Sequence, residues 1–397
     1  MKIFTLSVLL LLYSLSFTQE EYKKKKLTKA ELSLLFGYYE QEGDNSAVEG
    51  GIGTEELQNR ASSIEVTLYW DSTKTLDVSA GLDIYSSAST DSIDFNNPSS
   101  ASSTDYRGHG KIAYEQKINK NTALGVQGSY SLETDYQSFG LGINYNNYSK
   151  DENTILSVGA QLFLDQIDRW YGGKRKGIIY PIELRDTSWF DINRRNTYTL
   201  NFSFQQVINK RTNVMLATAP TLQEGLLSTP FHRTFFIEQT EAKVENLPRT
   251  RFKLPIALKA NYFAWSFLIT QWTYRFYYDD FGITSHTAQI RTPVKLIPFL
   301  TFYPSYRFYR QTKSNFFQPY KEHSLDQVYY TSDHDLSAFY SHQLGIGLRL
   351  SPYNGLIRSK SGKKALKSFS FEYLRYNRST GLSAHQFSFS LDFIHQN

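Results

Sequence analysis

The chain contains no cysteine, and this absence excludes several classes of protein. Without thiols there is no disulfide framework, no Cys-ligated iron–sulfur cluster and no lipid-anchored cysteine after an export signal. Beyond its start the chain also lacks any run of 18 or more apolar residues, so a helical membrane protein is not expected. What it has is 16% aromatic residues, with 29 Tyr and 28 Phe, at a mean hydropathy of −0.44. This combination is typical of outer-membrane β-barrels.

The N-terminus predicts export. Residues 1–18 have the pattern of a signal peptide, with Lys2 before an apolar run and small residues for cleavage. A single membrane anchor is the alternative interpretation. A basic tail over residues 19–30 includes Lys23–Lys26, which could contact acidic lipid headgroups or a periplasmic partner, or remain solvated. The net charge is +5, but charges elsewhere are mixed in sign, so no nucleic-acid partner is predicted.

The barrel is predicted to span residues 31–397. Its clearest strand ends the chain, where Phe387, Phe389, Leu391 and Phe393 alternate with polar residues. Similar alternation recurs and predicts an all-β, transmembrane antiparallel up-and-down barrel of about 16 strands, within a range of 14–18. The predicted strands are residues 32–38, 64–70, 76–84, 107–118, 124–132, 139–145, 156–164, 198–204, 214–220, 252–258, 263–278, 288–296, 299–310, 340–350, 369–373 and 386–394.

The connections between these segments alternate in length, as expected for a barrel with both termini in the periplasm. The long, outer ones are residues 43–61, 86–106, 165–195, 223–250 and 312–335. The short, periplasmic ones are residues 71–73, 119–121 and 209–211 and turns near residues 261 and 297. One periplasmic connection, residues 351–367, is long. Three prolines, Pro293, Pro298 and Pro304, interrupt the second half, where proline is unfavourable in a sheet.

Charges on the polar faces of the strands fall on two opposite walls of such a barrel. The predicted acidic wall consists of Glu65, Asp77, Asp83, Glu372 and Asp392. The predicted basic wall consists of Arg251, Lys253, Lys259, Arg291 and Lys295. Across an open lumen, these walls would create a transverse field like that at a porin constriction. Alternatively, lumen-filling side chains or an inward loop pair the charges and close the pore.

Three motifs allow other interpretations. The Ser- and Asp-rich residues 86–105 could offer oxygen ligands to Ca²⁺, although Ser and Asx turns explain them without an ion. His323 and His334 share an outer loop that could hold a transition metal. Ser379 and His385 resemble a hydrolase pair, although Ser379 falls where the last hairpin must turn. We predict no metal site, no cofactor and no enzymatic activity.

Several segments resemble the domain-of-unknown-function family 3570. They are residues 45–55, the paired Ser-rich repeats, Tyr180–Arg185, Gly225–Arg233 and Tyr329–Asp333. The resemblance implies an exported outer-membrane barrel of a Gram-negative bacterium with no established activity. Members lie beside genes for a thioredoxin-like protein and a flavin transferase, which implies exported redox partners.

The matching segments fall mainly in predicted outer loops, which often carry function but can also require particular residues in order to pack. The resulting candidates are Asp91, Asp94, Asp105, Glu183, Arg185, His232, Arg233 and Asp333.

These patterns favour a porin-like channel or transporter for a small polar solute. A second hypothesis is a platform that binds a protein partner through its outer loops or its basic tail. A remote third is a lipid hydrolase that uses Ser379 and His385. The expected partners are outer-membrane lipids and the barrel-assembly machinery, which could recognise Phe393 near the C-terminus.

Overall fold

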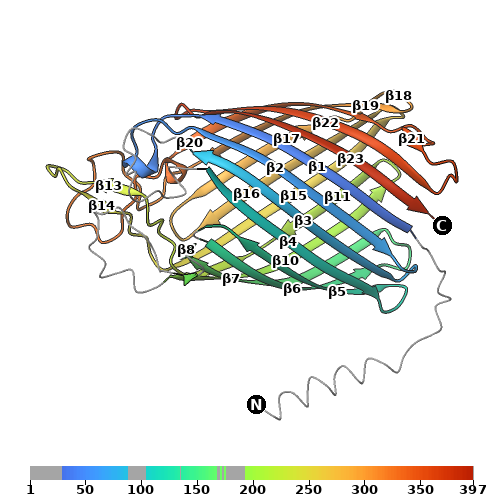
Figure 1. Cartoon of the computed structure of the whole chain (residues 1–397), viewed down its shortest axis with the longest axis horizontal. Coiled ribbons are helices and arrows are strands. Elements are labelled where there is room, and N and C mark those ends of the chain that lie inside the picture. Colours follow the sequence, from blue (N-terminus) through green and yellow to red (C-terminus); the bar gives the residue numbers. More distant parts are fainter. Residues whose placement is uncertain are drawn as a thin grey trace, which may run out of the picture.

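The computed structural model describes residues 29–87, 104–134, 136–167, 170–171, 174–175 and 193–396. Sixteen membrane strands form a closed antiparallel barrel, as predicted (Figure 1). They are β1 (Lys29–Glu42), β2 (Leu57–Tyr69), β3 (Lys74–Ser87), β4 (Thr104–Lys117), β5 (Thr122–Leu132), β6 (Tyr136–Tyr148), β7 (Thr154–Ile167), β10 (Arg194–Asn209), β11 with β12 (Thr212–Thr218 and Thr221–Gly225), β15 (Thr250–Trp265), β16 (Leu268–Asp279), β17 with β18 (Thr284–Arg291 and Val294–Ile297), β19 (Leu300–Gln311), β20 (Phe339–Leu350), β22 (Lys364–Arg378) and β23 (Ser383–Gln396).

Short elements lie outside this wall. They are the 3-10 helices η1 (Ala47–Glu49) and η3 (His334–Leu336) and the strands β8 (Trp170–Tyr171), β9 (Lys174–Arg175), β13 (Arg233–Phe235) and β14 (Ala242–Val244). The two-residue strand β21 (Ile357–Arg358) pairs with the start of β22 and belongs to the barrel sheet.

The first and last strands close the barrel. β1 pairs with β23 from Lys29 opposite Gln396 to Glu42 opposite Ser383. Every membrane strand therefore has two neighbours, and the barrel has no free edge on which another chain could pair. Within this register Phe393 lies opposite Leu32 and Phe389 opposite Phe36, so the apolar face of the last strand continues across the seam.

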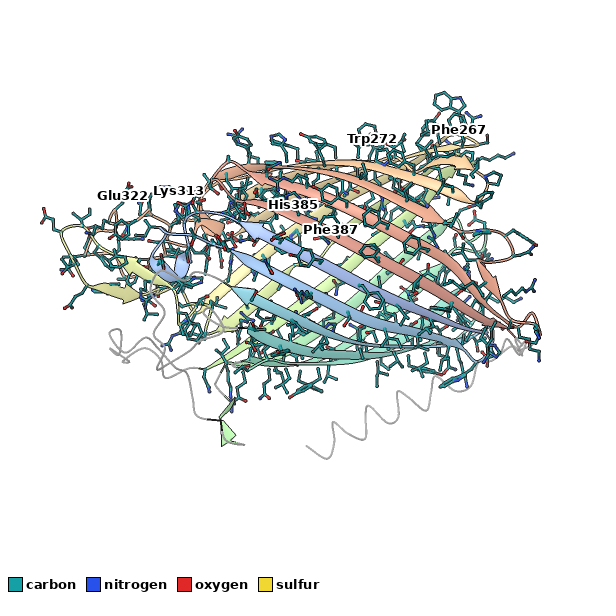
Figure 2. The ribbon with its side chains drawn as sticks, turned by 45° about the horizontal axis from the view of Figure 1, so that its top comes forward. Phe267, Trp272, Lys313, Glu322, His385 and Phe387 are labelled. Carbon is teal, nitrogen blue, oxygen red and sulfur yellow. The ribbon has the colours of Figure 1, made fainter. Side chains whose placement is uncertain are left out.

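The outer surface of the wall is apolar. Ile143 and Leu344 are 63% and 61% exposed, although both are large and hydrophobic. Side chains such as Trp272 and Phe267 project from the wall (Figure 2). A closed barrel with apolar residues outside and polar residues inside is suited to span a membrane, because pairing satisfies every strand's backbone and the exposed side chains match lipid. Among the described residues, no helix has the length and apolar character needed for a membrane span.

Several predicted boundaries in the second half were wrong. The turn expected near Asn261 lies at residues 266–267 instead, since β15 continues through Asn261 to Trp265. Likewise β22 is much longer than the predicted residues 369–373. In β15 the apolar residues Tyr262, Phe263 and Trp265 continue to the turn, so the apolar pattern does not mark where the strand ends. In β22 the charged residues Lys364 and Arg375 stand on the outward face, so the apolar pattern covers only the middle of the strand.

Prolines divide two of the strands. Pro220 lies between β11 and β12, and Pro293 lies between β17 and β18, while each neighbouring strand pairs continuously with both halves. Pro304 was expected to disturb the sheet, yet it lies inside β19 opposite Ile346. The Pro304 carbonyl still accepts a hydrogen bond from the Thr292 N–H at 2.9 Å. The sheet therefore loses only the one hydrogen bond that a backbone N–H at this position would donate.

The buried apolar core lies in the outer connections rather than in the barrel. The buried apolar side chains there are Leu226, Phe236, Val244, Leu247, Phe281, Ile283, Phe317, Tyr330 and Leu382. We call segments 43–56, 226–249 and 312–338 the cap. The cap lies at the end of the barrel opposite the C-terminus (Figure 1). The barrel interior is therefore left to polar side chains and cavities.

Candidate functional site: the charged lumen and its cap

The strand register places all ten predicted wall residues on the inward face. Glu65 lies opposite Ser33, and Ser33 lies opposite Asp392, while the neighbouring Ile64 is exposed on the outer face. On the other side of the lumen, Lys259 alternates in the same way with the exposed Leu258. Their proposed role in a transverse field remains a prediction.

The carboxylates of the acidic wall are held by nearby side chains. Asp392 accepts a hydrogen bond from Ser33 at 2.8 Å and lies 3.4 Å from the guanidinium of Arg349. Asp77 accepts a hydrogen bond from Thr67 at 2.6 Å. Asp83 lies 3.9 Å from Arg107 Nη1 and Glu372 pairs with Arg291, so three of the five acidic-wall carboxylates have a basic partner.

One ion pair joins the two walls. Arg291 Nη2 lies 3.2 Å from Glu372 Oε1, and both side chains are about one-third exposed. The guanidinium also lies 4.9 Å from the ring centre of Tyr303, which limits its movement. Both residues line the same lumen cavity. A pair of this kind is what the alternative interpretation, a lumen whose wall charges are paired, requires.

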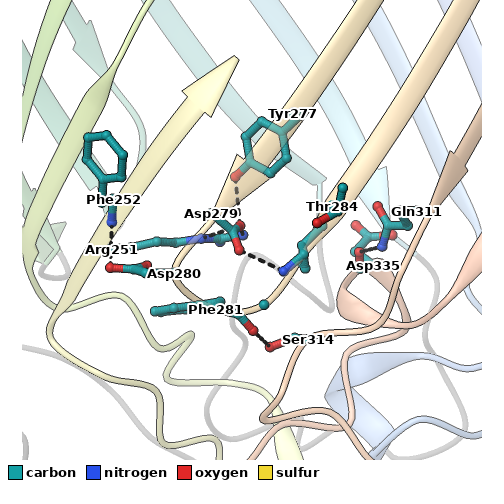
Figure 3. Close-up of polar contacts among 12 residues, drawn as sticks. Arg251, Phe252, Tyr277, Asp279, Asp280, Phe281, Thr284, Gln311, Ser314 and Asp335 are labelled. Atoms are coloured by element: carbon teal, nitrogen blue, oxygen red, sulfur yellow. Dashed lines mark hydrogen bonds and ion pairs between the residues drawn. The ribbon is translucent and has the colours of Figure 1, made fainter. Parts of the chain in front are cut away.

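Arg251 does not act as a free wall charge. It forms an ion pair with Asp279, which is fully buried and also accepts a hydrogen bond from Tyr277 at 2.8 Å (Figure 3). Asp279 Oδ1 accepts a further bond from the Ile283 N–H at 3.0 Å. Arg251 therefore fixes the outer ends of β15 and β16. The other basic-wall lysines, Lys253, Lys259 and Lys295, make no ion pair with any described residue.

Two cavities occupy the lumen. One, of about 730 Å³, is lined by Asp77, Glu115, Arg275 and Tyr277 among others. The second, of about 570 Å³, is lined by Asp83, Arg291, Arg349 and Glu372 among others. Sequence reasoning missed Glu115, Arg275 and Arg349, although each alternates with an outward apolar residue. Both cavities thus combine acidic and basic groups.

A third cavity, of about 380 Å³, lies at the outer mouth and is lined in part by Glu55, Arg307, Asp335 and Arg378. Asp335 comes from the cap and forms an ion pair with Arg378 of β22. Its backbone carbonyl accepts a hydrogen bond from Gln311 at 2.9 Å (Figure 3). An outer loop therefore reaches into the mouth of the lumen and is fastened there to the wall.

The environment of this mouth changes the acidity of Glu55. Burial, together with the negative charge of Asp335, raises the pKa of Glu55 to about 7, although Arg378 opposes the shift. Asp333 adds a smaller effect in the same direction as Asp335. The mouth consequently changes charge near neutral pH.

The cap has a core of its own. The Phe236 ring is fully buried and lies 4.9 Å from the Tyr330 ring and 5.7 Å from the His323 ring. The two longest segments of the cap are joined by a pair of backbone hydrogen bonds between Asn246 and Tyr330, at 3.1 and 2.7 Å. Aromatic packing and backbone pairing thus make the cap an ordered structure.

Two glycines attach the first cap segment to the others. Gly50 has φ +81, and a Cβ there would lie 2.6 Å from the Phe235 ring. Gly51 has φ +89, and a Cβ there would lie 2.8 Å from the Ser332 carbonyl oxygen. Only glycine accepts both the left-handed backbone and the close approach. This explains the Gly-Gly pair that the sequence presents in its first outer loop.

The predicted outer-loop residues have different roles. Asp105 is buried and accepts a hydrogen bond from Thr134 at 2.6 Å, so it supports a loop. Arg233 donates to the Val48 carbonyl at 2.7 Å and joins two cap segments. Residues Asp91, Asp94, Glu183 and Arg185 lie outside the described part of the chain, as do the signal peptide and most of the basic tail.

The two histidines of the suggested metal loop are engaged separately. His323 is fully buried, and its two ring nitrogens lie 2.7 Å from Gln327 Oε1 and 3.0 Å from the Thr331 carbonyl. A different set lies together: ligand atoms of His232, Glu245 and Asp333 fall within 4.8 Å of one another. No sequence spacing could indicate this set, because its members come from two distant segments.

Burial and neighbouring charges shift the pKa values of His232 and Asp333 in this trio. Burial alone lowers the pKa of His232, but the carboxylates of Glu245 and Asp333 outweigh it and raise the pKa to about 9. Burial raises the pKa of Asp333 to about 6 against the opposing effect of His232. The trio is therefore a concentrated negative environment that favours bound positive charge.

Ser379 and His385 do not form a catalytic pair in this structure. Ser379 Oγ accepts a hydrogen bond from the Tyr340 N–H at 3.1 Å in the last outer turn. His385 Nδ1 contacts the Tyr373 hydroxyl at 2.8 Å, and its Nε2 contacts Arg375. Both side chains thus have structural partners.

Comparison with known families assigns residues 72–360 to the family described as Protein of unknown function (DUF3570). The chain belongs to the DUF3570 family. This confirms the family resemblance, and three of the matching segments, residues 45–55, 225–233 and 329–333, lie in the cap or at its edge. No curated protein matches the chain.

Several solved structures show a likeness to this chain. OpdK of Pseudomonas aeruginosa, solved with vanillate, has 8% identity and a TM-score of 0.43, covering 93% of this chain and 99% of its own. A bacterial polysaccharide outer membrane secretin has 10% identity and a TM-score of 0.47, covering 93% and 98%. A BenF-like porin from Pseudomonas fluorescens Pf-5 has 8% identity and a TM-score of 0.42, covering 93% and 99%. At these values the likeness carries no argument about solute or mechanism.

Proposed function

We propose that this DUF3570 protein is a porin-like channel for small polar solutes in the outer membrane of a Gram-negative bacterium. Its export signal would be cleaved and both termini would face the periplasm. The observation that carries this proposal is the pair of lumen cavities, about 570 and 730 Å³, lined by inward-facing charges of both signs. If the side chains in the lumen served only to stabilise the barrel, we would expect a packed apolar core there. The buried apolar side chains lie mostly in the cap instead.

Charge in the second cavity gives the proposed channel its selectivity. Arg291 and Glu372 form an ion pair in its lining, which also contains Asp83 and Arg349. An ion or zwitterionic solute in this space would be oriented by both signs. Removing one partner of the central pair should leave the other charge unbalanced and shift the preference between cations and anions.

Proteoliposome swelling tests the proposal. Reconstituted protein should admit small polar solutes, such as amino acids and monosaccharides, faster than larger oligosaccharides. Arg291→Gln should favour cationic over anionic amino acids, and Glu372→Gln should have the opposite effect. Lys210→Gln, in an exposed periplasmic turn, is the matched control. Uptake no faster than in protein-free liposomes, for every solute and variant, contradicts the proposal.

A second candidate function is favoured by exposed apolar residues on the cap. Ile237, Leu325 and Val328 are 47%, 55% and 68% exposed although they do not face lipid. Such residues suit a surface that binds a protein partner. Crosslinking in cells, with photoreactive groups placed at these positions and at Glu322 as a polar control, should yield a specific adduct only at the apolar positions. Equal or absent crosslinking at all of them excludes this use of the cap.

A further inference from the structure

The trio His232, Glu245 and Asp333 lies inside the cap, away from the lumen cavities. His232 Nδ1 is 3.5 Å from Glu245 Oε1 and 3.9 Å from Asp333 Oδ2. His232 and Glu245 flank β13 and β14 in one cap segment, whereas Asp333 precedes η3 in another. The three groups therefore connect the two segments whose packing makes the cap.

The carboxylates are held in place by contacts outside the trio. Glu245 is 2% exposed, and its Oε2 accepts a hydrogen bond from the Thr229 N–H at 2.7 Å. The Thr331 hydroxyl donates to Glu245 Oε1 and also accepts from the Asp333 N–H at 3.0 Å. Supporting bonds of this kind orient the ligands of metal sites.

The trio itself is not closed by hydrogen bonds. His232 Nδ1 is buried and has no hydrogen-bond partner among the described residues. At 3.5 and 3.9 Å its separations from the two oxygens exceed ordinary hydrogen-bond lengths. Ligand atoms placed about 2.0–2.2 Å from a tetrahedral ion are roughly 3.3–3.6 Å apart. The two separations from His232 Nδ1 are thus close to the spacing that a small cation would impose, and all three ligand atoms lie within 4.8 Å of one another.

We propose that His232, Glu245 and Asp333 bind a divalent transition-metal ion, with Zn²⁺ as the best match. One imidazole nitrogen and two carboxylate oxygens are a ligand set that Zn²⁺ accepts, and solvent can supply the fourth ligand on the partly exposed side of His232 and Asp333. Ca²⁺ is a poor match because it takes six to eight oxygen ligands. Neutral His232 would leave the trio with two negative charges, which a divalent ion balances.

The ion would fasten the two cap segments together beside the lumen mouth. Asp333 is two residues from Asp335, whose ion pair with Arg378 fixes the cap to the barrel wall. Metal binding therefore stabilises the cap, and this consequence does not depend on what passes through the lumen.

Equilibrium dialysis of the full-length, folded protein against Zn²⁺, followed by elemental analysis, tests the site. The wild type should bind one Zn²⁺ per chain at micromolar or lower free metal. His232→Gln and Glu245→Gln should each weaken binding by at least about tenfold. Asp326→Asn, an exposed carboxylate of the same loop, is the matched control and should bind as the wild type does. Heat-modified migration in gels checks that each variant retains its barrel.

Hydrogen exchange supplies a second readout. At free Zn²⁺ about 100 times Kd, amides of segments 226–249 and 312–338 should exchange about 100-fold more slowly in the wild type. The same addition should not change exchange in His232→Gln. The proposal is overturned if the wild type does not bind one Zn²⁺ per chain. It is also overturned if His232→Gln and Glu245→Gln bind Zn²⁺ as well as the wild type does. In either case the trio is an ion pair between protonated His232 and the two carboxylates. Either result is independent of solute uptake.

Discussion

Replacing Phe236 by alanine should make the two long cap segments separate more often while the barrel stays folded. The ring is fully buried between Tyr330 and His323, so its loss creates a cavity as well as removing apolar contact. Truncation of a buried Phe typically destabilises by about 3–5 kcal/mol. Because about 1.4 kcal/mol corresponds to a factor of ten, the population of opened caps should rise roughly 100- to 4,000-fold.

Hydrogen exchange measures this opening directly. The amides of Asn246 and Tyr330 bond to each other's carbonyls across the two cap segments, so they exchange only when the segments separate. Phe236→Ala should accelerate their exchange by the factor above, while amides of β1 and β23 remain protected. Ile237→Ala is the control, since the neighbouring side chain is 47% exposed. Equal acceleration in the two variants, or none in either, would refute a cap with its own core.

Three further predictions concern the mouth and its attachment. Cation preference should rise as pH increases from about 6 to 8, because ionisation of Glu55 with its pKa of about 7 adds negative charge, and Glu55→Gln should remove this dependence. Arg378→Ala should increase current fluctuations, since it frees Asp335 from the wall. Gly51→Ala should destabilise the cap by about 1–3 kcal/mol, seen as faster amide exchange, because its φ of +89 and the Ser332 oxygen exclude a Cβ.

Each of these has a matched control. Glu56→Gln changes an exposed neighbour of Glu55 and should leave the pH dependence intact. Arg310→Ala removes an exposed charge at the outer end of β19 and should leave current noise unchanged. Gly362→Ala places the same strain in a periplasmic loop, where it should not affect cap exchange. A control that reproduces its partner's effect contradicts the corresponding prediction.

Glu55 also affects stability in a defined pH window. Its pKa is raised from 4.5 in the unfolded chain to about 7 in the fold, so the folded state binds the proton more tightly. The contribution is therefore present below pH 4.5 and is lost as pH rises through 7. Thermal or denaturant unfolding of the cap should show the wild type losing stability relative to Glu55→Gln across this range.

The barrel could be predicted from the sequence because its signal is local. Phe387, Phe389, Leu391 and Phe393 reveal β23 by alternation alone, and long outer connections reveal the topology. The alternation was lost where charged residues replaced apolar ones on the outward face near the ends of a strand. Lys364 begins β22 and Arg375 lies near its end, so the apolar pattern covers only the middle of the strand.

The cap could not be predicted because it depends on contacts between distant segments. Asn246 and Tyr330 are paired across 84 residues, and neither shows a regular period. The same is true of Glu245, whose partners Thr229 and Thr331 lie in two segments. Family resemblance pointed to these loops, but it could not show that they pack into one body.

Single-channel recording of the purified protein in planar bilayers tests the central claim most directly. We predict discrete conductance steps whose reversal potential in a salt gradient moves in opposite directions for Arg291→Gln and Glu372→Gln. The absence of conductance at any voltage, both in the wild type and after shortening of segment 312–338, would show that the lumen is not a pathway.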